Sequence, residues 1–111
     1  MLKKPGNEIV SEKFFTKRKF DEFIVEKSDR ELAKKIFELL KDSKAEEIVL
    51  IDVRDSLNLA DYIFICEGRS QLHCRGIAEN VMFRLKNQGE IHLGIEGEVE
   101  GNWVLLDYGN I

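Results

Sequence analysis

DYIFICEGRSQLHCRGIAENV, at residues 61–81, contains a short apolar segment, a turn and the beginning of an amphipathic segment. Its first part, 61–67, is apolar at odd and even positions alike, which predicts a strand covered on both faces. Ser70 comes two residues after a glycine and is a preferred N-cap residue, because its hydroxyl oxygen accepts a backbone N–H of the first helical turn. The pattern therefore predicts a helix from about Gln71 to Asn87, with Gly89 as a left-handed cap.

The residues upstream extend this strand–turn–helix unit. EIVLIDV, at 47–53, predicts another strand covered on both faces, and a loop over 54–60 joins the two strands. Ser28 and Glu31 have the spacing of a capping box, which predicts a helix that begins there and ends near Asp42. The apolar faces expected for the two helices consist of Leu32, Ile36, Leu39 and Leu40 in the first, and Leu72, Ile77, Ala78, Val81 and Leu85 in the second.

Two more strands are expected near the C-terminus, at 91–95 and 102–108. Along the second, side chains alternate between two faces, and the core face consists of Val104, Leu106 and Tyr108. The order helix, strand, strand, helix, strand, strand predicts an α/β or α+β layer fold, in which helices pack on a mixed sheet. The connection between the strands at 61–67 and 91–95 is expected to be right-handed.

The first 27 residues are expected to form a partly ordered N-terminal extension, ahead of a domain over 28–111. Phe15, Phe20 and Phe23 have loose helical spacing, which predicts a short amphipathic helix. No segment has the roughly 18 consecutive apolar residues that a membrane-spanning helix requires, and the N-terminus lacks the apolar core of a secretory signal. A cytoplasmic location is therefore expected.

Charge is distributed unevenly along the chain. The formal net charge is −4, yet no Lys or Arg occurs after Lys86. The acidic residues in that last segment are Glu90, Glu96, Glu98, Glu100 and Asp107. A surface built from this segment repels phosphate backbones and attracts a basic protein, so little or no direct nucleic-acid binding is expected.

Two kinds of catalytic site bear on the segment around Ser70. A nucleophile elbow requires Gly-x-Ser-x-Gly, and position 72 is leucine, so capping and packing explain Ser70 and His73 better than a hydrolase site does. Nucleotidyltransferases also have Gly-x-Ser before a helix, whose N-terminus receives phosphate, and they need paired carboxylates for Mg²⁺. The nearest pair is Asp52 and Asp55, and a spacing of three directs these side chains to opposite faces of a strand.

Cys66 and Cys74 are the only cysteines, and they do not form a Cys-x-x-Cys pair. Zinc sites usually require four ligands, so two reduced cysteines in packing roles are the expected state. These patterns predict no metal, no cofactor and no catalytic activity.

The strand expected at 102–108 carries the most prominent binding candidate. Trp103, Leu105 and Asp107 share the face opposite the core face, within the acidic segment. Tryptophan is a frequent anchor of protein interfaces, and an acidic rim suits a partner rich in Lys and Arg. Ordinary packing is the alternative explanation of this face.

Several short motifs in the same order resemble the ribosomal silencing factor family, also called the Iojap-like family. The motifs are Leu59-Ala60-Asp61-Tyr62, Gly68-x-Ser70-x-x-His73, Ile77-Ala78-Glu79, Glu96-Gly97 and Trp103-Val104-Leu105-Leu106-Asp107-Tyr108-Gly109. The resemblance runs from about Glu31 to Ile111, so it covers most of the chain but not its first 30 residues.

The resemblance implies a non-enzymatic translation factor. Family members bind the large ribosomal subunit at ribosomal protein L-fourteen, a basic protein, and prevent the small subunit from joining, which lowers translation. The resemblance also implies a nucleotidyltransferase-like layer fold without the catalytic carboxylates, and it makes a homodimer a candidate state. It assigns the contact strand to Trp103, Leu105 and Asp107, with Glu96 and Tyr108 beside them.

Two departures from the family pattern affect what is expected. Members usually continue into another strand and a C-terminal helix, whereas this chain stops at Ile111; the Phe-rich segment before residue 28 is a candidate to cover the sheet in their place. Asn110 stands where the family commonly has Asp, so it is not counted as a contact. Two alternatives stay open: a Mg²⁺-dependent enzyme that uses Ser70 and Asp52, and a family relative that acts in large-subunit assembly.

Overall fold

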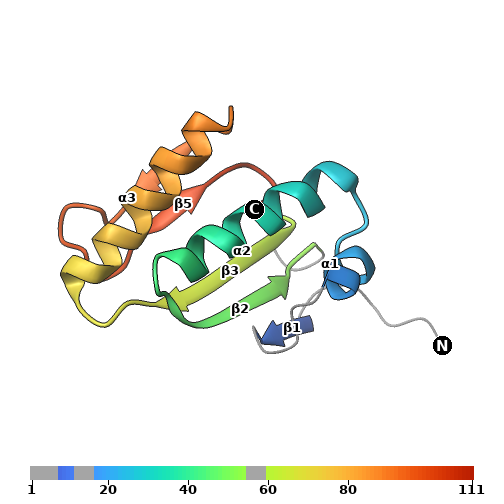
Figure 1. Ribbon diagram of the computed structural model, residues 1–111, viewed down its shortest axis with the longest axis horizontal. Helices are drawn as coiled ribbons and strands as arrows, with labels where there is room; N and C mark the ends of the chain where they lie inside the picture. The colour runs from blue at the N-terminus through green and yellow to red at the C-terminus, as the bar shows by residue number, and fades with distance from the viewer. Residues whose placement is uncertain (1–7, 12–16, 55–59) are drawn as a thin grey trace.

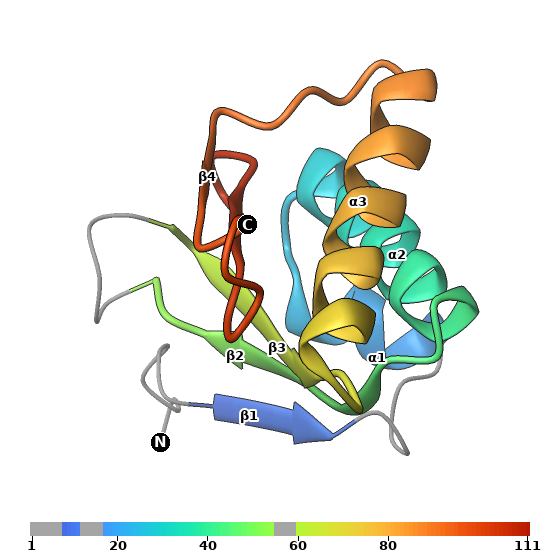
Figure 2. The same cartoon turned by 90° about the vertical axis from the view of Figure 1, so that its left-hand side faces the viewer.

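Three helices pack on one face of an antiparallel sheet in the computed structural model, which describes residues 8–11, 17–54 and 60–111 (Figures 1 and 2). The expected layer fold is confirmed in its α+β form. The elements are β1 (Glu8–Ser11), α1 (Lys17–Phe23), α2 (Lys27–Asp42), β2 (Glu46–Asp52), β3 (Tyr62–Glu67), α3 (Gln71–Asn87), β4 (Gly94–Glu96) and β5 (Leu105–Asp107). None of the helices among these residues is long and apolar enough to span a membrane.

The sheet has the order β1-β2-β3, and both of its strand pairs are antiparallel. The expectation of a mixed sheet is wrong for the described strands, because β4 and β5 pair only with each other, as a separate antiparallel ribbon. Each of these two strands has only three residues, so the ribbon is short. The connection through α3 therefore joins two sheets, and the rule for right-handed crossovers within one sheet does not apply to it.

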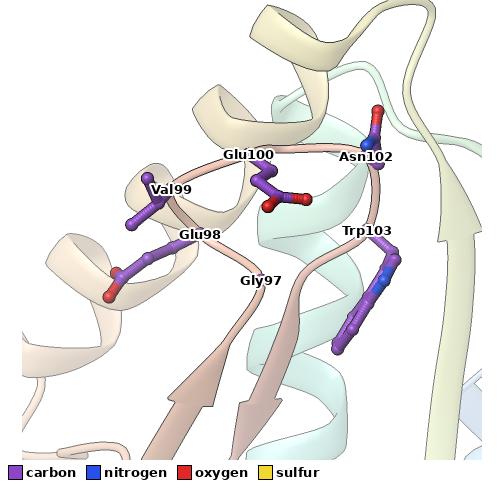
Figure 3. A pocket seen from close by; sticks show the side chains of 6 residues that line it. All are labelled: Gly97, Glu98, Val99, Glu100, Asn102 and Trp103. Carbon is purple, nitrogen blue, oxygen red and sulfur yellow. The ribbon is translucent and has the colours of Figure 1, made fainter.

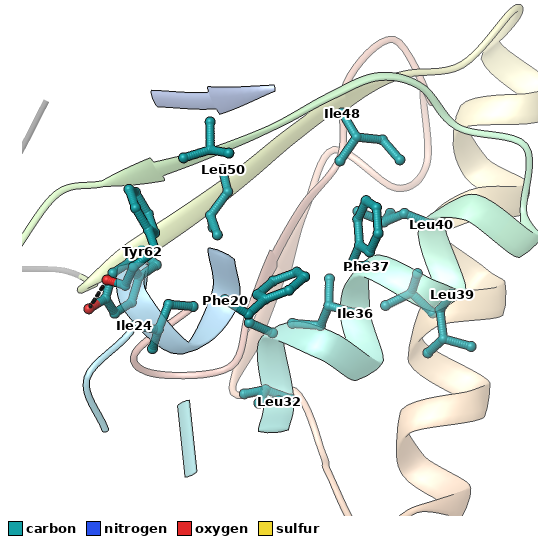
Figure 4. Close-up of a cluster of buried hydrophobic side chains, with 14 of the residues drawn as sticks. Phe20, Ile24, Leu32, Ile36, Phe37, Leu39, Leu40, Ile48, Leu50 and Tyr62 are labelled. Atoms are coloured by element: carbon teal, nitrogen blue, oxygen red, sulfur yellow. Dashed lines mark hydrogen bonds between the residues drawn. The ribbon is translucent and has the colours of Figure 1, made fainter. Parts of the chain in front are cut away.

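The hydrophobic core lies between the sheet and the helices (Figure 4). Ile48, Leu50 and Tyr62 are the largest fully buried side chains that the sheet contributes, and α2 faces them with its apolar side. The other face of the sheet is not covered by the helices, and Ile65 there is 50% exposed. The expectation of strands covered on both faces is thus not met within the described residues; β-branched residues favour strands by propensity even where burial is partial.

The start of α2 differs from the expected capping box. Glu26 is the N-cap residue, its side chain makes no capping hydrogen bond, and Ser28 lies inside the first turn. The N–H of Arg30 donates to the carbonyl oxygen of Glu26 (3.0 Å), which closes the first turn two residues earlier than expected. Only Ile24, Val25 and Glu26 separate the two helices, so the chain enters α2 directly after the buried Ile24.

The expected ends of α3 are confirmed. The Oγ of Ser70 accepts the backbone N–H of His73 (3.0 Å). At the other end, Gly89 has a φ of +87°, and the N–H of Glu90 donates to the carbonyl oxygen of Leu85 (2.8 Å), as in a Schellman motif. The expected burial of Leu72 is wrong, since this side chain is 77% exposed. At 100° per residue it lies opposite the buried face of α3.

The segment before residue 28 contributes to the same core. Phe20, Phe23 and Ile24 are buried, and the rings of Phe20 and Phe37 are 5.7 Å apart between centroids. The short helix expected around these phenylalanines is present as α1, while Phe15 lies outside the described residues. The structure thus places part of the predicted extension in the core, and the division at residue 27 stays a prediction.

Candidate partner-binding surface

The ribbon of β4 and β5 presents one side to solvent. In its antiparallel register Glu96 lies opposite Leu105, Ile95 opposite Leu106, and Gly94 opposite Asp107. Residues opposite each other share a face, and faces alternate along a strand. Glu96, Leu105 and Asp107 therefore lie on one face, as expected from the sequence, and Leu106 lies on the other.

Exposure separates these two faces further. Trp103 is 59% exposed and Leu105 is 49% exposed, whereas Leu106 packs against the core. Large apolar side chains left in water are a feature of interaction surfaces when they are grouped. Leu105 and the carboxylates of Glu96 and Asp107 thus share one face of the ribbon, and the exposed indole of Trp103 stands in the turn, two residues before β5 begins.

Tyr108, the fifth predicted site residue, lies apart from the others. Its ring packs against the core and meets the ring of His92 edge-on, at 6.5 Å between centroids. Burial and the nearby charge of Glu90 raise the pKa of its hydroxyl. This hydroxyl is buried without a hydrogen-bond partner among the described residues. Tyr108 therefore supports the exposed face from beneath rather than forming part of it.

The turn between the two strands is held in one shape. Gly97 and Gly101 have φ values of +78° and +76°, and the N–H of Gly101 donates to the carbonyl oxygen of Gly97 (3.0 Å). A Cβ at position 97 would collide with the carbonyl oxygen of Trp103, and one at position 101 would meet the side chain of Arg75. The side chains of Gln71 and Asn102 are hydrogen-bonded, which attaches the turn to the start of α3.

Negative charge on this surface is not neutralised by ion pairs among the described residues, although the side chain of Arg75 lies against Gly101. Glu96, Glu98 and Glu100 are exposed, and none of them forms an ion pair with another described residue. Asp107 accepts the backbone N–H of Gly109 at its Oδ1 (2.8 Å) and also lacks a cationic partner in the described part of the chain. The charge and the exposed apolar groups therefore occupy the same surface.

The Gly-x-Ser-x-x-His motif is a structural joint between α2 and α3. The Nδ1 of His73 accepts the backbone N–H of Arg69 (2.9 Å), so Nε2 carries the proton and donates to the carbonyl oxygen of Ser43 (2.8 Å). The side chain of Asn80 donates to the Oγ of the same serine (2.7 Å). Both ring nitrogens of the histidine are thus engaged, and Ser70 is engaged as the helix cap. The interpretation of this segment as a capped turn is supported by this geometry.

The surroundings of Asp52 and Cys66 also indicate structural rather than catalytic roles. Asp52 is buried, and its carboxylate forms a bidentate pair with Arg54, whose Nη2 lies 2.6 Å from Oδ2. Asp55, the other candidate Mg²⁺ ligand, lies outside the described residues. Burial raises the pKa of the Cys66 thiol to about 11, which keeps it protonated and unreactive. The described residues contain no group of three or more His, Cys, Asp or Glu side chains placed to bind a metal ion.

Asn110 has a role that the sequence motifs did not indicate. Its side-chain amide donates to the Oδ1 of the buried Asp29 in α2 (3.2 Å), and its carbonyl oxygen accepts the N–H groups of Asp61 (2.8 Å) and Tyr62 (3.0 Å). One residue thereby connects the C-terminal segment to the start of α2 and to the start of β3. An aspartate at this position would face the carboxylate of Asp29.

We expect Asn110→Asp to lower the free energy of unfolding by about 1–2 kcal/mol at neutral pH, since a donated hydrogen bond to a carboxylate becomes a repulsion. Urea unfolding at neutral pH measures this. Combining Asn110→Asp with Asp29→Asn should restore a donor–acceptor pair and most of the stability. A double variant no more stable than Asn110→Asp would contradict the role assigned to this contact.

Comparison with known proteins agrees with this arrangement. The family model described as ribosomal silencing factor during starvation (RsfS) matches residues 26–111. Ribosomal silencing factors of Chromobacterium violaceum and Halalkalibacterium halodurans are each 30% identical to this chain, over 82 and 84 residues. These matches cover 74% and 76% of this chain, and 67% and 72% of the relatives. An Iojap-related mitochondrial protein of Arabidopsis thaliana is 33% identical over 76 residues, 64% of this chain and 41% of that protein.

Two solved structures match a similar share of the chain at a similar identity. A crystal structure of a protein from Chromobacterium violaceum has a TM-score of 0.70 at 31% identity, over 73% of this chain and 68% of that one. One from Bacillus halodurans has a TM-score of 0.67 at 30% identity, over 73% and 75% of the two chains. Since the family model covers most of the sequence and the fold agrees with both structures, this chain belongs to the ribosomal silencing factor family.

Proposed function

We propose that this protein is a translation repressor that binds the large ribosomal subunit at ribosomal protein L-fourteen and blocks joining of the small subunit. Membership of a family named for silencing ribosomes supports regulation of translation at the ribosome. The observation that carries the choice of surface is the exposure of Trp103 and Leu105, with Glu96 and Asp107 on the face of Leu105, in a segment without Lys or Arg.

The contact would work by shape and charge, without chemical change. Trp103 is the apolar anchor, because a partly exposed indole that becomes fully desolvated at an interface contributes more than most other side chains. Glu96 and Asp107 are the groups that would pair with Lys or Arg of a basic ribosomal protein. A bound factor occupies the joining surface, so repression rises with its concentration relative to its dissociation constant.

The proposal includes no catalysis, no cofactor and a protein rather than a nucleic acid as the direct partner. The acidic ribbon face supports this choice, since it repels phosphate. A Mg²⁺-dependent enzyme gains no support from Asp52, because its carboxylate is paired with Arg54.

A role in large-subunit assembly would use the same surface and differ in the step at which the factor binds. A cytoplasmic location and a homodimer in the unbound state belong to the proposal on family grounds.

Co-sedimentation tests the proposal directly. The purified protein is centrifuged with isolated large subunits, isolated small subunits and joined ribosomes at near-physiological salt. We expect it to sediment with large subunits only, and to lower the yield of joined particles when it is added before the small subunit. Sedimentation with joined ribosomes as readily as with large subunits would contradict a block of joining, because the surface would then be accessible after joining.

A further inference from the structure

The turn that joins β4 and β5 borders an open hollow of about 320 Å³ (Figure 3). It is lined by Gly97, Glu98, Val99, Glu100, Asn102 and Trp103. In this view Glu98 and Val99 lie on one side of the turn, Trp103 lies on the other, and the carboxylate of Glu100 points into the space between them. Val99 is 82% exposed and its side chain points away from Trp103, so the indole ring is the apolar side chain that faces the hollow.

The hollow has a fixed frame. The positive φ values of Gly97 and Gly101 and the hydrogen bond between them set the path of the turn. The contact of Gly101 with Arg75, and the hydrogen bond between Gln71 and Asn102, attach it to α3. A frame that is already ordered loses little conformational entropy on binding.

Charge indicates the kind of group that fits. Glu98 and Glu100 form no ion pair with another described residue, and the chain has no Lys or Arg after Lys86. A lysine or arginine side chain combines an apolar stem with a terminal cation, and such a cation is attracted both to carboxylates and to the face of an indole ring. An aromatic wall beside a carboxylate that points into the hollow is complementary to that combination.

We propose that the hollow at the β4–β5 turn receives one lysine or arginine side chain of a basic protein partner. The methylene groups would pack against Trp103, and the cation would lie beside the carboxylate of Glu100, with Glu98 adding its charge at the outer side of the turn. Where that partner is the ribosomal protein L-fourteen, the inference rests on the proposed function and adds the turn to the contact strand on β5. The turn would then help to select the partner, because a neutral or acidic side chain could not replace the cation.

The test reverses the charge of the turn in the full chain. Glu98→Lys with Glu100→Lys should weaken binding to isolated large subunits by about tenfold or more, and most strongly at about 50 mM salt. Glu31→Lys with Glu79→Lys is the matched control, because it changes the net charge equally at exposed positions on α2 and α3. The control should lose no more than about twofold. Equal affinity of the turn variant and the wild type would overturn the inference and leave the proposed function in place.

A second measurement distinguishes failure of this inference from failure of the proposed function. Trp103 is the only tryptophan, so intrinsic fluorescence reports on one wall of the hollow. Titration with a hexalysine peptide should shift or quench its emission in the wild-type chain and in the control, but not in the turn variant. If the wild-type protein does not sediment with large subunits, the proposed function fails. The fluorescence titration then tests, independently of the ribosome, whether the hollow binds a cationic side chain. A response confined to chains with Glu98 and Glu100 supports the inference, and no response overturns it.

Discussion

Replacing Trp103 with alanine should remove measurable binding to large ribosomal subunits while leaving the protein folded. The side chain is 59% exposed on the free protein and lies in the turn two residues before β5, so it contributes little to the core. Truncating an aromatic residue at the centre of an interface typically costs about 2–4 kcal/mol, which is about 30- to 900-fold in the dissociation constant. Co-sedimentation measures the affinity, and circular dichroism with thermal unfolding confirms the fold.

Phe83→Ala is the matched control for this prediction. Phe83 is 64% exposed on α3, so the control removes an aromatic side chain of similar exposure from a different element. Its affinity for the large subunit should remain within about twofold of the wild type. Loss of binding by both variants would point to a general effect of exposed aromatic groups. Unchanged binding by Trp103→Ala would show that the contact lies elsewhere.

Local patterns predicted the parts of the molecule that depend on short-range interactions. The bounds of α3 follow from Ser70 and Gly89, which act on backbone groups within one turn of themselves. The separation of Leu105 from Leu106 follows from the alternation of a strand. The alternation does not reach Trp103, which lies two residues before β5 begins, so its place in the contact surface stays a prediction.

Features that depend on distant contacts were not predictable in the same way. Ser43 receives hydrogen bonds from His73 and Asn80, which are 30 and 37 residues away in the chain. Asn110 meets Asp29 across 81 residues. A motif identifies such residues as unusual but cannot name their partners, because the partners are fixed by packing of the helices. The pairing of β4 with β5, in place of a mixed sheet, likewise depends on packing that local patterns do not specify.

The N-terminal segment is the clearest case in which packing overrides the pattern. Its aromatic residues have only loose helical spacing, so the sequence suggested an extension beside the domain. In the structure Phe20 is buried against Phe37 of α2, and the hydroxyl of Tyr62 in β3 lies 3.5 Å from the carbonyl oxygen of Phe23. Residues from α1, α2 and β3 therefore form one core, and α1 should be required for its stability.

Phe20→Ala tests this requirement. Removing a buried phenylalanine typically costs about 3–5 kcal/mol, through lost burial and the cavity left behind. For a chain of 111 residues, this corresponds to a fall in melting temperature of about 10 °C or more. Val25→Ala is the control, because Val25 lies five residues away, is 66% exposed and should change stability by no more than about 0.5 kcal/mol. Equal melting temperatures for Phe20→Ala and the wild type would mean that α1 is dispensable for the core. The segment before residue 28 would then be an extension that contributes little to stability.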